Sequence, residues 1–102
     1  MPSAAPAVWG QVASGTISGT ITDESGAVIP SATVIIANKS TGATRTVNAN
    51  AEGLYSAPAL LAGDYQVRTE TQSFRTMERE AQVLAGTETT VNMVMKLGES
   101  KK

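Results

Sequence analysis

At 102 residues, of which 41% are hydrophobic, the chain is long enough to form one folded domain with its own core. Its net charge is −1, and eight basic residues among nine acidic ones create no positive field for a phosphate backbone, so we expect no nucleic-acid partner. The absence of cysteine and histidine excludes disulfides, the usual zinc and copper ligands, and the Ser-His-Asp and Cys-His types of nucleophile.

The first segment, residues 1–14 (MPSAAPAVWGQVAS), has no charged side chain and contains the only tryptophan. Three interpretations stay open for it. It is a loose terminal tail, the remnant of a secretory signal with small residues near a cleavage site, or an extra strand. In the third case Val8, Trp9 and Val12 would pair with an open sheet edge of the same or another molecule and form an assembly strand.

The stretch 15–34, GTISGTITDESGAVIPSATV, predicts a strand, a turn and a second strand. Apolar or small residues alternate with hydroxyl side chains over residues 15–22, and this period of two is typical of a half-buried strand. The sequence Asp-Glu-Ser-Gly, which ends at Gly26, has turn chemistry. Beyond the following proline the alternation starts again and predicts a strand over residues 32–38.

Aromatic side chains are expected to pack in the core around one strand glycine. Gly19 lies inside the first predicted strand, where a glycine weakens pairing unless another side chain packs on it. Tyr55 and Tyr65 are the candidates for that contact, and Phe74 is expected to pack under the sheet.

Three further strands are predicted in the middle of the chain. Residues 43–49 read as an exposed or edge strand, residues 54–57 as a short strand that ends at Pro58, and residues 65–71 as a strand with one apolar face. The leucine pair at 60–61 is expected to close the core. Glycines mark the places where the chain must reverse between strands: Gly26, Gly42, Gly53 and Gly63.

The last two predicted strands cover residues 77–84 and 88–97. Glu and Arg in the first of them favour a helix, but a helix of eight residues is marginal, so we predict a strand. Seven short strands with glycine-containing turns indicate an all-β, seven-stranded antiparallel β-sandwich over residues 15–97. Residues 98–102 form a polar C-terminal end.

Taken together, several pieces of the sequence resemble the carboxypeptidase regulatory-like domain. They are GTISGTITDESGAVIPSATV (15–34), NKSTG (38–42), EGLY (52–55), LLAGDYQV (60–67), SF (73–74) and LAGTETTVNM (84–93). The resemblance implies a transthyretin-like (prealbumin-like, Cna B-like) sandwich with an Ig-like Greek key. Similar domains stand at the N-terminus of bacterial TonB-dependent outer-membrane receptors, and residues 7–19 look like that context.

No catalytic, cofactor-binding or metal-binding residue is predicted, and the resemblance transfers none. An intramolecular isopeptide bond, as in related adhesin sandwiches, needs a lysine in an early strand, and residues 15–22 contain none. Calcium would need a ligand-rich loop, whereas the acidic residues lie in separate turns. No apolar run approaches the roughly 20 residues of a membrane-spanning helix.

Three functions follow from these observations. The first is a non-catalytic extracytoplasmic sandwich that serves as an accessory or protein-interaction domain of a secreted or outer-membrane bacterial protein. The second is a structural subunit of an extracellular filament or surface assembly, joined to neighbouring copies by N-terminal strand addition. The third is a carbohydrate- or peptide-binding module, for which Trp9 is the only spare aromatic side chain.

Overall fold

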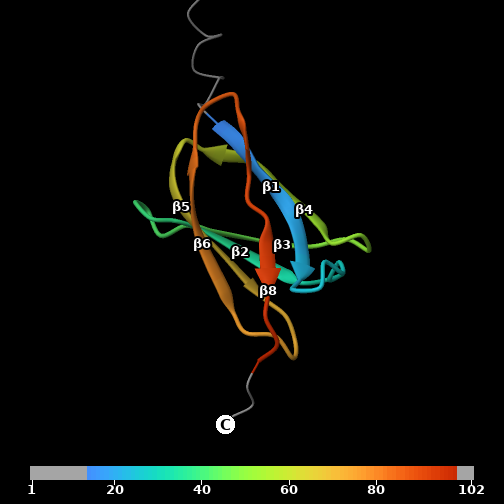
Figure 1. The fold of residues 1–102 in the computed structure, drawn as a ribbon. Coiled ribbons are helices and arrows are strands. Elements are labelled where there is room, and N and C mark those ends of the chain that lie inside the picture. Colours follow the sequence, from blue (N-terminus) through green and yellow to red (C-terminus); the bar gives the residue numbers. More distant parts are fainter. Residues whose placement is uncertain (1–13, 99–102) are drawn as a thin grey trace, which may run out of the picture.

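The computed structural model describes residues 14–98, which form two β-sheets packed face to face (Figure 1). One sheet has the order β4-β1-β7, with β8 also paired to β1, and the other has the order β3-β2-β5-β6. The predicted all-β sandwich is therefore confirmed. The strands are β1 (Ser14–Asp23), β2 (Thr33–Asn38), β3 (Thr44–Asn48), β4 (Leu54–Leu61), β5 (Gly63–Glu70), β6 (Met77–Val83), β7 (Glu88–Thr90) and β8 (Met93–Met95).

Strand β1 is the centre of the first sheet. It pairs with β4 in antiparallel orientation and with β7 and β8 in parallel orientation. Its side chains alternate between buried and half-buried positions, as the period of two predicts. Because β8 runs parallel to β1, the chain enters the sandwich at one end and leaves at the other, from blue to red in Figure 1.

The second sheet is antiparallel throughout. The predicted edge strand is confirmed as β3, whose side chains are exposed or half-buried along its whole length. The segment for which a helix was the alternative is confirmed as strand β6, the other edge of this sheet. Within residues 14–98 no helix is long and apolar enough to cross a membrane.

The core lies between the two sheets and is aliphatic, with two tyrosines and two methionines. The inward residues of all the strands except β7 belong to one continuous cluster or pack against it. The buried apolar residues are Ile17, Ile21, Ile29, Ala32, Val34, Ile36, Ala49, Tyr55, Ala57, Leu60, Tyr65, Val67, Val83, Val91, Met93 and Met95.

The prediction of one continuous last strand over residues 88–97 is wrong, because that stretch forms the two short strands β7 and β8. Between them, Val91 N–H donates to the Ser18 carbonyl at 2.7 Å, and the Asn92 side-chain Oδ1 accepts from Thr20 N–H at 2.9 Å. An amide side chain therefore replaces a main-chain acceptor where the ladder breaks. If β7 and β8 are counted as two parts of one predicted strand, the sandwich has the expected seven strands. Both parts run parallel to β1, whereas an antiparallel sandwich was expected.

The prediction that Pro58 ends its strand is also wrong, because β4 continues to Leu61. The register against β1 shifts here, so that Pro58 and Ala59 form a β-bulge opposite Thr16. Proline is tolerated at this position because β4 is an edge strand. Of the two leucines expected to close the core, Leu60 is buried, whereas Leu61 is 51% exposed.

Gly19 allows the backbone between β7 and β8 to lie directly against β1. A Cβ atom on Gly19 would stand 1.9 Å from the Val91 carbonyl oxygen and 3.0 Å from the Tyr55 ring. The Tyr55 hydroxyl donates to the same carbonyl oxygen at 2.5 Å. Of the two tyrosines expected to pack on Gly19, it is Tyr55 that does so.

We expect Gly19→Ala to lower the free energy of unfolding by about 3 kcal/mol or more, since its methyl group would displace backbone rather than a flexible side chain. Urea unfolding would measure this loss. Gly26→Ala is the control: Gly26 has φ +92° and no atom within 4 Å of a built Cβ, so only left-handed strain of about 1 kcal/mol applies. Equal losses in the two variants would contradict the packing argument.

Burial raises the pKa of Tyr55 from 10.0 to about 12. Since the folded pKa exceeds the unfolded one, this contribution to stability is complete below about pH 10 and is lost as the pH rises toward 12. We expect Tyr55→Phe to cost about 1 kcal/mol at neutral pH through the lost hydrogen bond. The variant should then lose less stability than the wild type between neutral and strongly alkaline pH, as measured by urea midpoints. Equal losses of stability in the variant and the wild type would show that a group other than Tyr55 titrates.

Candidate functional site

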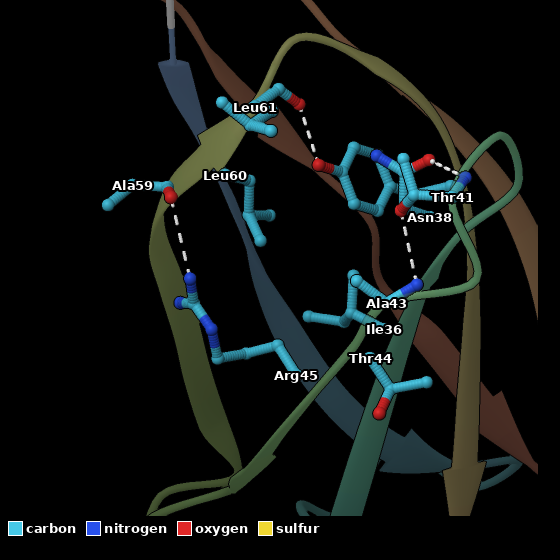
Figure 2. A pocket seen from close by; sticks show the side chains of 10 residues that line it. Ile36, Asn38, Thr41, Ala43, Thr44, Arg45, Ala59, Leu60 and Leu61 are labelled. Atoms are coloured by element: carbon cyan, nitrogen blue, oxygen red, sulfur yellow. Dashed lines mark hydrogen bonds between the residues drawn. The ribbon is translucent and has the colours of Figure 1, made fainter. Parts of the chain in front are cut away.

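A pocket of about 160 Å³ opens at the edge of the sandwich where β3 faces β4 (Figure 2). We call it the β3–β4 cleft. It lies where the two sheets separate, so its walls come from both of them. The residues that line it are Ile36, Asn38, Thr41, Ala43, Thr44, Arg45, Ala59, Leu60, Leu61 and Tyr65.

The inner part of the cleft is apolar. Ile36 and Leu60 are core residues that are 1% and 4% exposed, and they extend the core to the surface at this point. Tyr65, also 4% exposed, donates its hydroxyl hydrogen to the Leu61 carbonyl at 2.6 Å. The aromatic ring therefore adds apolar surface while its polar atom is already satisfied.

Arg45 connects the two walls of the cleft. Its Nη1 donates to the Pro58 carbonyl at 2.8 Å and its Nη2 to the Ala59 carbonyl at 3.4 Å. The bulge turns both carbonyl groups toward β3, and Figure 2 shows Arg45 reaching across to Ala59. The guanidinium thus links the edges of the two sheets with hydrogen bonds to neutral acceptors.

Asn38 orders the turn at the far end of the cleft. Its Oδ1 accepts from Ser40 N–H at 2.8 Å and from Thr41 N–H at 3.0 Å. Thr41 Oγ1 in turn accepts from Ala43 N–H at 3.1 Å. These local bonds fix the turn between β2 and β3 and satisfy most of the polar atoms on this rim.

The cleft is suited to a small apolar group. Its lining contains no carboxylate, and the Asn38 amide and the Thr41 and Tyr65 hydroxyl groups already take part in hydrogen bonds that hold the fold. Across residues 14–98, no group of three or more acidic side chains could hold a metal ion. The volume of about 160 Å³ is of the order of one aliphatic side chain.

The opposite side of the sandwich is connected in the same way. Arg79 of β6 donates from Nη1 to the Asn92 carbonyl at 3.1 Å, and Thr89 Oγ1 donates to the Gln82 carbonyl at 2.9 Å. On both open sides, an arginine of the second sheet therefore binds a carbonyl group of the first sheet.

The structure separates the residues that were singled out from the sequence. Val8, Trp9 and Val12 lie outside the described residues. Gly26, Gly42 and Gly53 are at turns with positive φ, and Gly63, with φ 154°, begins β5. Gly19 and Tyr55 meet in the core, Tyr65 lines the cleft, and Phe74 is half-buried against the core.

The turn that ends at Gly26 is held by one carboxylate. Asp23 Oδ1 accepts from Ser25 Oγ–H at 2.6 Å, Ser25 N–H at 2.9 Å and Ala27 N–H at 3.1 Å. The hydroxyl bond from Ser25 is the main cause that lowers the pKa of Asp23. These bonds explain the Asp-Glu-Ser-Gly pattern by turn geometry, without a ligand.

Sequence reasoning missed Arg45. The available signal is its position in the alternation of β3, where it shares the inward side with Val47 and Ala49. A charged residue on an inward side of an edge strand needs an acceptor. The acceptors are created by the bulge at Pro58 and Ala59, which the sequence did not predict.

A family model for the carboxypeptidase regulatory-like domain matches residues 16–96. A comparison with curated protein sequences finds no match.

Solved structures with the same fold come from proteins of different kinds. The Bacillus anthracis TIE protein has a TM-score of 0.72 and 15% identity, over 83% of this chain and 17% of that one. Acinetobacter radioresistens catechol 1,2 dioxygenase has a TM-score of 0.70 and 11% identity, over 94% and 56%. The group B streptococcus pilus 2b backbone protein has a TM-score of 0.63 and 14% identity, over 83% and 42%. This chain thus spans between 17% and 56% of the length of these three proteins.

We expect Arg45→Gln to lower the free energy of unfolding by about 1 kcal/mol, because two carbonyl groups lose a charged donor. For a domain of this size, that loss shifts the melting temperature by about 4–8 °C. The matched control is Arg68→Gln, which breaks the exposed ion pair with Glu70 and should change the melting temperature little. Similar shifts of the melting temperature in both variants would show that Arg45 stabilises the fold no more than an exposed ion pair does.

Proposed function

Because the chain belongs to the carboxypeptidase regulatory-like domain family, we propose that it is a non-catalytic domain that acts outside the cytoplasm. In this proposal it is an accessory or protein-interaction part of a larger secreted or outer-membrane bacterial protein. A TonB-dependent receptor is the parent protein that the sequence resemblance favours. The ligand of the domain is then a protein surface, and no cofactor takes part.

The outer face of the first sheet supports this proposal, and it is the observation on which the proposal rests. On β1, half-buried hydroxyl side chains alternate with the core residues. Exposed neighbours on β4 and β8 include Leu54, Leu61 and Val94. Glu88, on the edge strand β7, adds a charged group to this face, and its carboxylate accepts from Ser18 Oγ–H at 2.5 Å. Interface cores are typically depleted of charge, as this face is.

The outer face of the second sheet is different. Arg68 of β5 forms an ion pair with Glu70, and Lys39 pairs with Glu80 of β6 at 3.0 Å. Glu78 stands opposite Arg68 in the ladder between β5 and β6. Exposed ion pairs of this kind are typical of a solvated surface. The contrast between the two faces makes the first sheet the better docking surface.

We expect a photo-crosslinking residue at Ser56, on the first sheet, to capture protein partners in the native host. The same residue at Gln66, on the second sheet, should capture none or far fewer, because that face is solvated. The crosslinked products should be found in the periplasmic, outer-membrane or extracellular fraction. Equal capture at both positions would refute the assignment of the face, and a cytoplasmic location would refute the proposed function.

A structural subunit of a surface assembly is the second candidate function. Since β1 and β8 are parallel, residues 14–98 begin and end at opposite ends of the sandwich, which suits copies that follow one another in line. One structural neighbour is named as a pilus backbone protein. The N-terminal segment with Val8, Trp9 and Val12 would join the copies.

Carbohydrate binding has less support. Sugar recognition would use an exposed aromatic face, but Tyr55 and Tyr65 are each 4% exposed. Within residues 14–98 a peptide that places one apolar side chain in the β3–β4 cleft fits better than a sugar.

A further inference from the structure

We propose that the outer edge of β3 accepts residues 8–12 of a second copy of this chain as an added strand. This inference rests on the second candidate function, assembly through the N-terminal segment, and names the surface that receives the segment. It follows from the backbone hydrogen bonds of the four edge strands, which differ from one another.

The outer edge of β3 has free backbone groups. Asn38 N–H donates to the Ala43 carbonyl, and Ala49 N–H donates to the Ala32 carbonyl. The backbone groups of Ala43 and Ala49, which flank β3, therefore point toward β2. In an antiparallel ladder the direction alternates from residue to residue. The outward positions are therefore Thr44, Thr46 and Asn48, whose backbone groups have no partner among the described residues. All three residues are uncharged and exposed.

The outer edge of β4 is blocked. Leu54 N–H donates to Asn50 Oδ1 at 3.0 Å, and the Leu54 carbonyl accepts from Asn50 N–H at 2.8 Å. Pro58 has no N–H, and its carbonyl accepts from Arg45. By alternation, Ser56 alone keeps a free outward pair, which is too little for a strand ladder.

The other two edges are protected against pairing. The outward positions of β6 include Glu78 and Glu80, and charged residues oppose strand addition. The next outward carbonyl, that of Gln82, accepts from Thr89 Oγ1. Strands β7 and β8 have three residues each, and the Asn92 carbonyl between them accepts from Arg79.

The N-terminal segment has the composition of a partner for β3. Residues 7–13 carry no charge and contain no proline, so every residue can donate to a ladder. In a strand, Val8 and Val12 lie on one side, and Trp9 and Gln11 on the other. With the valines on the core side, one of them would enter the β3–β4 cleft, whose apolar lining and volume of about 160 Å³ suit an aliphatic group.

The segment must come from another copy. Ser14 belongs to β1 in the first sheet, and β3 is the edge of the second sheet, about 10 Å away across the sandwich. If residues 8–12 paired with their own β3, Ala13 alone would connect Val12 to Ser14, a reach of about 7.6 Å at most. Such a contact is heterologous, so each copy would donate at one site and accept at another, and the assembly would continue as a chain.

The absence of cysteine makes disulfide trapping a clean test. One full-length variant carries Gln11→Cys as donor, and separate full-length variants carry Thr44→Cys, Thr46→Cys or Asn48→Cys as acceptors. The control acceptor is Gln82→Cys on β6. Donor and acceptor are mixed under mild oxidation and separated on a non-reducing gel, while light scattering and negative-stain microscopy report particle size for the wild type.

We expect the Gln11→Cys donor to form a disulfide-linked heterodimer with at least one of the β3 acceptor variants and none with the Gln82→Cys control. The wild type should form particles larger than a monomer. Large particles without a β3 crosslink would overturn the acceptor assignment but leave assembly standing. Wild-type monomers at every concentration would overturn both. A donor and β3 acceptor placed in one chain that crosslink as a monomer at high dilution would show that the segment folds back on its own sandwich.

Discussion

The contact between Gly19 and the Val91 carbonyl determines how the C-terminal part of the chain joins the sandwich. Because no side chain stands on Gly19, the backbone between β7 and β8 lies directly on β1, where it receives the Tyr55 hydroxyl. The ladder breaks at this point, and the Asn92 side chain supplies the missing acceptor. The parallel pairing of β1 with β8, and thus the exit of the chain at the far end, depends on this close approach.

A sandwich leaves four sheet edges, and this one treats them unequally. Arg45 and Arg79 of the second sheet each bind carbonyl groups of the first sheet, which joins the sheets on both open sides. Asn50 binds the outward backbone groups of Leu54 on β4. On β6, carboxylates and the hydrogen bond from Thr89 oppose the addition of another strand. The outer edge of β3 lacks such protection. Because edge strands are normally protected, one unprotected edge beside an apolar cleft is the feature that most needs a functional explanation.

The fold by itself does not decide the function. Structures with the same architecture include a dioxygenase and a pilus backbone protein, at identities of 11% and 14%. Function must therefore be argued from surfaces. On this chain the surfaces are a sheet face with few charges, a solvated face with ion pairs, and a small apolar cleft that contains no carboxylate. They are the basis on which a protein partner is proposed.

The sequence by itself determined the fold class and nearly all strands. Alternation with a period of two and turn glycines are local patterns, and the strands and turns of the folded chain agree with them. The sequence also predicted that Tyr55 or Tyr65 packs on Gly19, and the structure shows that Tyr55 does so. Only the tertiary structure decided the parallel pairing of β8, the continuation of β4 through Pro58, and the role of Arg45. Each of these depends on which backbone groups of distant segments remain unpaired after the sheets form, and no local pattern contains that information.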